Sequence, residues 1–138
     1  MAEVLQALGS EHVLVVHSKD GLDEISISAP TQVAELKDGA ISEYEISPDT
    51  FGLSMTPLEE LVVADSQQSL GKVNEALSGK GGASDIVAMN AGAAIYVSGQ
   101  TKSLVAGVEM ARDAIGAGLA KERLKDFVEF TKQLVEPS

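Results

Sequence analysis

The segment DIVAMNAGAAIYVSG, residues 85–99, constrains the fold more strongly than any other part of the chain. It is apolar on nearly every side and rich in alanine and glycine, a pattern that predicts a helix in the interior. Small side chains also allow neighbouring elements to approach closely. Such a helix needs partners on more than one face, so we expect the other elements to pack around it.

The first half of the chain has strand-like patterns, and the second half has helical ones. Asp38-Gly39 lies between two short apolar runs and predicts a tight hairpin. We expect strands in the runs HVLVV, EISISA, TQVAEL, ISEYEI and LEELVVA, which are residues 12–16, 24–29, 31–36, 41–46 and 58–64. In EISISA, alternation would place Ile25 and Ile27 on one face of the strand.

Helical patterns begin and end the sequence. A short helix is expected to end near Gly9, and a longer one to start at Asp65, with Gln68 completing a signal that resembles a capping box. Further helices are expected over the apolar segment near residues 86–97, within residues 103–118 and within residues 121–135. The glycine-rich residues 79–84 lack the Lys-Ser or Lys-Thr pair of a phosphate loop, so we expect a flexible linker there. Strands followed by helices predict an α+β domain or one piece of a larger α/β domain.

Composition narrows the range of partners. The formal net charge of −11 disfavours binding to nucleic acid or to an anionic membrane surface. The absence of cysteine excludes disulfides and thiolate nucleophiles and fits a cytoplasmic protein. We expect no membrane span, because no apolar run approaches about 20 residues, and no signal peptide, because MAEVLQALGS lacks a basic start and a continuous apolar middle. With only ten Lys and Arg residues, an anionic substrate would be held most readily through a metal ion.

Two adjacent acids, Asp23 and Glu24, follow the first predicted strand. Mg²⁺ prefers oxygen ligands and keeps several waters, so two carboxylates and a substrate phosphate are enough to hold it. Neighbours in a regular strand point to opposite faces, but Gly21 allows the irregular backbone that a shared ligand would need. The alternative interpretation is a solvated turn with no ligand.

The residues just before the acidic pair offer further candidates. His17 could bond to a substrate or to an acid–base partner, and Ser18 and Lys19 could contact a phosphate. Capping and turn roles explain all three equally well. His12, at the start of the strand, is expected to be structural.

Four stretches together resemble one enzyme family. The stretches are LGSEHVLVVHSKDGLDEISISAPTQVAEL, ISEYEISPDTFGL, LEELVVADSQQS and IVAMNAGAAIYVSGQTKSLVAGVEMARDAIGAG, and the family is the anthranilate phosphoribosyltransferases of tryptophan biosynthesis. The resemblance implies an α/β fold, with a mixed sheet and packed helices, as part of a nucleoside phosphorylase/phosphoribosyltransferase-like catalytic domain. It implies transfer of phosphoribosyl from phosphoribosyl pyrophosphate to anthranilate in a homodimeric, Mg²⁺-dependent enzyme. In that family the Asp-Glu of the GLDE turn holds magnesium, which implies Asp23 and Glu24 as the metal ligands.

The resemblance covers only the C-terminal part of the family. The family's Gly-Thr-Gly-Gly-Asp pyrophosphate loop, its Lys-His-Gly-Asn segment and its N-terminal helical domain are not found in this sequence. Residues 1–138 are therefore expected to form a partial α/β domain with no catalytic turnover of its own. The competing hypothesis is a non-catalytic module that binds metal or associates with itself. Thymidine and pyrimidine phosphorylases are a third possibility, which the GLDE turn fits less well.

Overall fold

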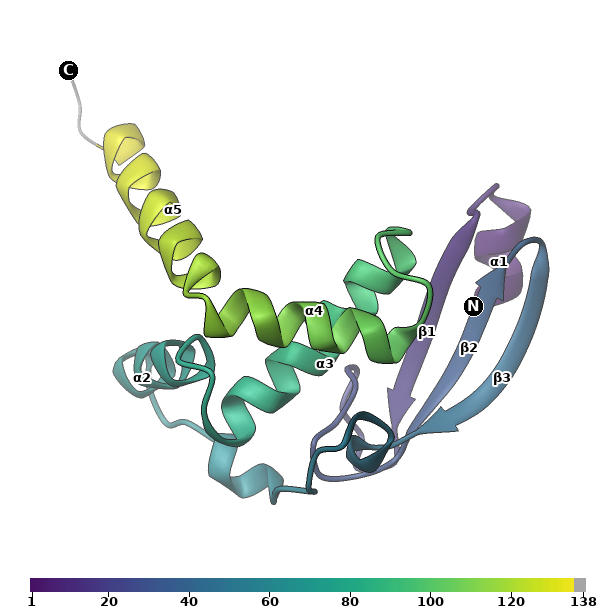
Figure 1. Ribbon diagram of the computed structural model, residues 1–138, viewed down its shortest axis with the longest axis horizontal. Coiled ribbons are helices and arrows are strands. Elements are labelled where there is room, and N and C mark those ends of the chain that lie inside the picture. The colour runs from purple at the N-terminus through teal and green to yellow at the C-terminus, as the bar shows by residue number, and fades with distance from the viewer. Residues whose placement is uncertain (136–138) are drawn as a thin grey trace.

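The computed structural model describes residues 1–135 as a short first helix, a small sheet and a group of further helices, in that order (Figure 1). The elements are α1 (Ala2–Ala7), β1 (His12–Ser18), β2 (Thr31–Lys37), β3 (Ala40–Ile46), the 3₁₀ turns η1 (Pro48–Phe51) and η2 (Leu58–Leu61), α2 (Ser66–Ala76), α3 (Gly81–Val97), α4 (Leu104–Gly116) and α5 (Leu119–Val135). In Figure 1, α3 and α4 cross between the sheet and α2, while α5 extends away from the body. No helix among residues 1–135 has the length and apolar character needed to cross a bilayer.

The sheet contains three antiparallel strands in the order β1-β2-β3. Val33 pairs with Val16 on one side and with Tyr44 on the other. Asp38 and Gly39 both have positive φ, +50° and +76°, as a two-residue hairpin turn requires. The predicted hairpin is confirmed, and so is the α/β class. The mixed sheet is not found among the described residues, because both connections return antiparallel and neither is a crossover.

Two of the predicted strands are wrong. Residues 24–29 form an irregular loop in which Ile25 and Ile27 are both fully buried. The Ser26 amide donates to Thr31 Oγ1 at 3.1 Å instead of joining a ladder, so the alternating pattern reflects a loop that inserts two isoleucines into the core. Leu58–Leu61 is a 3₁₀ turn that directly follows Pro57, and Val62 beyond it is 72% exposed.

The predicted linker is also wrong in part, since residues 81–84 form the first turn of α3. Gly82 packs against Thr56, and a Cβ at Gly82 would lie 2.8 Å from Thr56 Cγ2. The glycine at this point therefore allows a close approach between helix and loop. By contrast, the predicted start of α2 is confirmed, because Asp65 Oδ1 accepts a hydrogen bond of 2.8 Å from the Gln68 amide.

As predicted from its composition, α3 has partners on more than one side, with Ala88 and Met89 almost fully buried, but it is not interior all round, because Val87 and Ala94 are exposed. It packs against α2, α4 and β1. At the crossing with α4, a Cβ on Gly92 would lie 2.5 Å from Val108 Cα, and one on Gly107 would lie 2.3 Å from the Gly92 carbonyl oxygen. Glycine on both helices is therefore what lets the two backbones meet.

The main hydrophobic core joins the sheet, the loop after β1 and the helices α3 and α4. Its buried members come from all of these parts and from the segment around η1: Ile25, Ile27, Val33, Ile46, Phe51, Leu53, Met89 and Val108. Because two of them belong to the loop directly after Glu24, the core also determines where the acidic pair lies.

The helix crossing gives a stability prediction. We expect Gly92→Ala to lower the free energy of unfolding by about 1–3 kcal/mol, because the added methyl overlaps the Val108 backbone. Gly71→Ala is the matched control: Gly71 lies within α2 with open space around it, so alanine should be neutral or stabilise by up to about 1 kcal/mol. Urea denaturation of both variants tests this, and equal effects would contradict the packing argument.

Candidate functional site

The acidic pair lies in a tight turn that follows β1. The Gly21 amide donates to the Ser18 carbonyl, and the Ser18 amide donates to the Leu22 carbonyl, both at 3.0 Å. Gly21 has φ +93°, a conformation that other residues rarely adopt. The backbone is thus irregular at Asp23 and Glu24, as predicted, and both residues are exposed.

Asp20 organises this turn from its N-terminal side. Its carboxylate accepts hydrogen bonds from the Leu22 amide at 3.3 Å, from Ser26 Oγ at 2.5 Å and from Ser28 Oγ. Partial burial favours a higher pKa for Asp20, but the bonds from Ser26, Ser28 and the Leu22 amide outweigh it and hold the pKa well below its usual range. Asp20 is therefore an ionised structural acid, which sequence reasoning missed.

Asn90 of α3 holds the turn from its C-terminal side. Its Oδ1 accepts from the Ile25 amide at 3.0 Å, and its Nδ2 donates to the Ile25 carbonyl at 2.9 Å. The pair of bonds joins residues 65 positions apart in the sequence. Sequence reasoning missed Asn90 too, although it was the only amide within an otherwise apolar helix segment.

Asp23 and Glu24 differ from Asp20 and Glu45 because their carboxylates have no partner within the described part of the chain. Among residues 1–135, neither forms a hydrogen bond or an ion pair, whereas Asp20 is fully engaged. Glu24 borders a recess formed by Ile86, Val87, Asn90 and Ala91 of α3. Two adjacent carboxylates open to solvent are suitable ligands for a hard cation such as Mg²⁺.

The described residues do not enclose a metal ion by themselves. Within residues 1–135, no group of three or more His, Asp or Glu side chains has metal-binding geometry. Asp23 and Glu24 would therefore supply only part of a coordination shell, and water or phosphate oxygens would have to complete it. Mg²⁺ is commonly bound in this way, through one or two carboxylates and a substrate phosphate.

Two of the other candidates near the turn, Ser18 and Lys19, have structural partners. Ser18 is fully buried with its hydroxyl 3.4 Å from the Pro30 carbonyl, and Lys19 forms an ion pair of 2.5 Å with Glu45 of β3. His17 is exposed at the end of β1. The turn interpretation of Ser18 and Lys19 therefore fits the structure better than contact with a phosphate.

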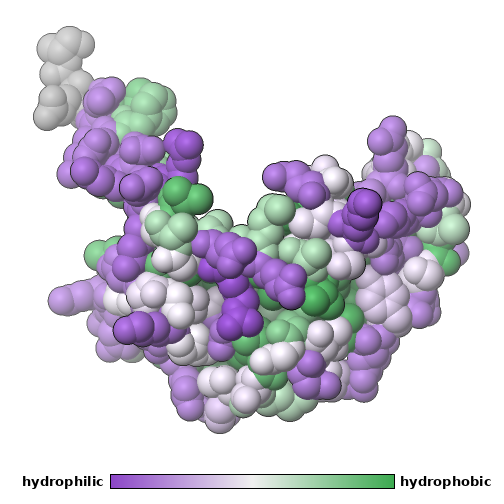
Figure 2. Space-filling view, viewed as in Figure 1, coloured by the Kyte–Doolittle hydropathy of each residue, from purple (hydrophilic) through white to green (hydrophobic). Residues whose placement is uncertain are grey.

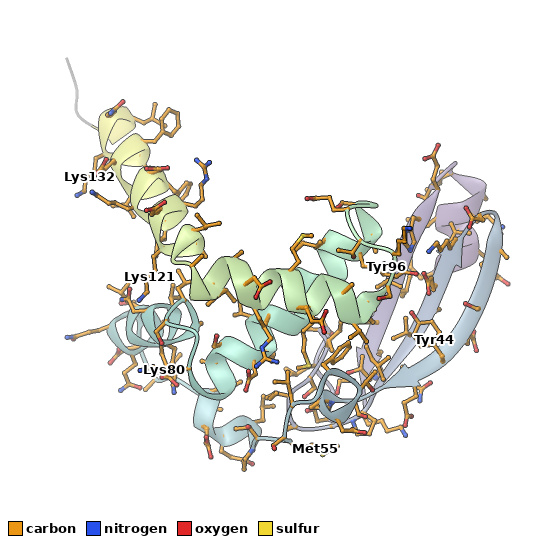
Figure 3. All side chains as sticks on the ribbon, viewed as in Figure 1. Tyr44, Met55, Lys80, Tyr96, Lys121 and Lys132 are labelled. Atoms are coloured by element: carbon orange, nitrogen blue, oxygen red, sulfur yellow. The ribbon has the colours of Figure 1, made fainter. Side chains whose placement is uncertain are left out.

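A second polar cluster lies at the opposite end of β1. Glu35 of β2 accepts from Tyr96 at 2.7 Å and from Tyr44 at 2.8 Å, and His12 Nε2 lies 2.9 Å from its carboxylate. Lys37 donates to the Tyr96 hydroxyl at 3.0 Å. Figure 3 shows Tyr96 at the end of α3 beside the sheet and Tyr44 on β3. This cluster fastens α3 to the sheet, and His12 has the structural role predicted for it.

The electrostatics of the cluster agree with a structural role. Burial favours a higher pKa for Glu35, but hydrogen bonds from Tyr96, Tyr44 and His12 outweigh it and lower the pKa. Burial and the neighbouring Glu35 carboxylate both raise the pKa of Tyr44. Glu35 is therefore ionised and Tyr44 neutral at pH 7, which keeps the hydrogen bond between them intact.

Comparison with known proteins places the chain in a glycosyl transferase class. Residues 1–121 match the family described as "Glycosyl transferase family, a/b domain", and the chain belongs to this family. Within it, the chain is similar to the anthranilate phosphoribosyltransferases of Marinomonas sp. (strain MWYL1), at 56% identity over 99% of this chain, and of Cellvibrio japonicus, at 55% over 97%. The chain spans about 40% of the length of each of these relatives.

Solved structures show the same relationship. A crystal structure of anthranilate phosphoribosyltransferase from Thermus thermophilus aligns with 95% of this chain and 39% of its own length, with 34% identity and a TM-score of 0.84. The Saccharomyces cerevisiae enzyme in complex with PRPP and Mg aligns with 86% of this chain and 34% of its own length, with 23% identity and a TM-score of 0.73. The second similarity concerns the fold alone.

The Asp20 hydrogen bonds give a prediction about pH. Because its folded-state pKa is lowered, ionised Asp20 stabilises the protein above the unfolded pKa of about 4, and this stability is lost as the pH falls. Asp20→Asn should therefore lower the free energy of unfolding by roughly 1 kcal/mol at pH 7, a value reduced for solvent exposure. The difference in free energy of unfolding between wild type and Asp20→Asn should shrink as the pH falls from about 5 towards about 2.

Urea denaturation across that pH range measures the difference. In a Ser26→Ala background, Asp20→Asn should have a smaller effect, because one of the bonds is already missing. A difference that stays constant over the whole range would contradict the assignment of Asp20 as an ionised anchor.

Proposed function

We propose that this chain is the part of an anthranilate phosphoribosyltransferase that carries the magnesium carboxylates, Asp23 and Glu24. The whole enzyme would transfer phosphoribosyl from phosphoribosyl pyrophosphate to the amine of anthranilate and release pyrophosphate. The similarity to curated relatives over almost the whole chain supports the family activity. One observation supports the proposed metal site most directly. Asp23 and Glu24 are adjacent and exposed, and their carboxylates have no partner among the described residues. Hydrogen bonds hold the turn that carries them on both sides.

Charge explains why the chain would need a metal to meet such a substrate. With a net charge of −11 it repels a free diphosphate, and the one lysine in the turn, Lys19, is paired with Glu45. Asp23 and Glu24 would hold Mg²⁺ from the protein side, leaving its other positions to water and to diphosphate oxygens. Bound there, the metal supplies positive charge that stabilises the departing pyrophosphate.

Other features of the complete enzyme belong to the same proposal. Residues 1–138 would be a partial C-terminal α/β domain, with the helical domain and the glycine-rich loop supplied by the rest of the enzyme. Among the described strands, β1 and β3 each pair only with β2, so both edges of the sheet are open to the further strands that would complete a mixed sheet. Binding of anthranilate and phosphoribosyl pyrophosphate, assembly into a homodimer and a cytoplasmic location are likewise proposed for the whole enzyme.

Metal binding tests the site directly. We expect the double variant Asp23→Asn, Glu24→Gln to bind Mn²⁺ about tenfold more weakly or worse than wild type, because both ligands lose their charge. Electron paramagnetic resonance of free Mn²⁺ measures the affinity. The control is Glu59→Gln, Glu60→Gln, which removes the same charge from another adjacent, exposed pair in η2. Equal weakening in both double variants would show only general attraction to an acidic surface.

Catalysis by the chain alone gives a second test. Loss of anthranilate fluorescence in the presence of phosphoribosyl pyrophosphate and Mg²⁺ should be undetectable, because the pyrophosphate-loop motif of the family is not in this sequence. Turnover comparable to that of a full-length enzyme would contradict the proposed division of the site.

The self-associating module is the second candidate function. It is favoured by the exposed apolar side chains of α5, among them Phe127, Phe130 and Leu134, which are 64%, 59% and 70% exposed. In Figure 2, α5 stands clear of the body with apolar residues among charged ones. Sedimentation velocity over a range of concentrations should show association that the double variant Phe127→Ser, Phe130→Ser abolishes. A wild-type monomer at all concentrations would contradict this candidate.

A further inference from the structure

We propose that Asn90 is a positioning residue for the metal carboxylates. By holding the backbone of Ile25, its side-chain amide fixes the direction in which the adjacent Glu24, and Asp23 before it, present their carboxylates. The inference rests on the proposed function, since it concerns the same pair of acids.

The Asn90 amide uses three of its hydrogen-bonding positions within the protein. Oδ1 accepts from the Ile25 amide, and Nδ2 donates both to the Ile25 carbonyl and to the Ile86 carbonyl, each of these last two bonds being 2.9 Å. A rotated amide would place Nδ2 against the Ile25 N–H, so only one orientation satisfies the backbone. The Asn90 side chain therefore bonds to both the N–H and the C=O of Ile25, as the backbone of a neighbouring strand would.

The helix that carries Asn90 is itself firmly anchored. Met89, its neighbour in sequence, is fully buried, and Tyr96 near the end of α3 is tied to Glu35. Ile25 is 1% exposed, so its side chain is held in the core while its backbone is held by Asn90. The C-terminal end of the turn is therefore held in two independent ways.

The N-terminal end of the turn is held by Asp20, through its bonds to Leu22 and Ser26. Between Asp20 and Ile25 only residues 21–24 remain, and the acidic pair makes up half of them. Two adjacent carboxylates repel each other, so a free loop would turn them apart and a metal would have to bring them back. Because both ends of the turn are held, the positions of the two carboxylates are fixed before the metal binds. Residues that contact the ligands, and not the metal, have this effect at other metal sites.

The experiment compares metal affinity with stability in the 138-residue chain. Asn90→Ala should weaken Mn²⁺ binding about tenfold or more in the electron paramagnetic resonance assay. It should also speed hydrogen exchange at the Ile25 amide. Ile115→Ala, near the end of α4 in the separate apolar cluster with Ala111, should destabilise the protein but leave Mn²⁺ affinity within about twofold while the protein is folded.

A measurement on the wild-type protein keeps the inference testable even if Asn90→Ala does not fold. If the Asn90 clamp favours metal binding, the metal must stabilise the clamp to the same extent, because coupling between sites is reciprocal. Saturating Mg²⁺ should therefore slow hydrogen exchange at the Ile25 amide. Unchanged exchange at Ile25 would overturn the role of Asn90.

The outcomes separate the two proposals. If Asn90→Ala keeps wild-type affinity while Asp23→Asn, Glu24→Gln loses it, the positioning role is wrong and the metal site stands. If the carboxylate double variant also binds as wild type does, both the positioning role and the proposed metal site are wrong.

Discussion

The burial of α3 is the constraint on which the rest of this structure depends. A helix without a polar face needs packing partners on several sides, and the contacts that α3 makes are specific. Gly92 and Gly107 let α4 cross at backbone distance, Tyr96 bonds to Glu35 of the sheet, and Asn90 bonds to the loop after β1. The three contacts make α3 the common support of the sheet, the helices and the acidic turn.

Acidic residues within a short stretch of this chain have different roles because their surroundings differ. Asp20 is surrounded by hydroxyl and amide donors, which stabilise its charge and use up its lone pairs. Asp23 and Glu24, a few residues later, have no donor of this kind among the described residues and remain available for an external cation. A carboxylate already satisfied by the protein is a poor metal ligand, so the division of roles follows from hydrogen bonding.

Sequence patterns predicted the local features well, and contacts between distant segments explain the rest. The hairpin at Asp38-Gly39 and the cap at Asp65 are confirmed, and residues 86–97 pack against several elements, with Val87 and Ala94 left exposed. The alternation of Ile25 and Ile27 was misread as a strand, because a loop that buries two residues has the same period. The acidic pair could be found because its members are adjacent, whereas a single amide in an apolar helix does not reveal that its partner is Ile25, 65 positions away. The mixed sheet was inferred from the family resemblance alone, and the three described strands do not form one.

The most direct test is to locate a bound cation on the folded chain. Paramagnetic broadening of amide NMR signals by substoichiometric Mn²⁺ gives its position without any variant. We expect broadening centred on residues 22–25 and on the facing turn of α3, residues 86–91. Broadening centred on another acidic segment, such as Glu59 and Glu60, or spread evenly over the surface would contradict a metal site at Asp23 and Glu24.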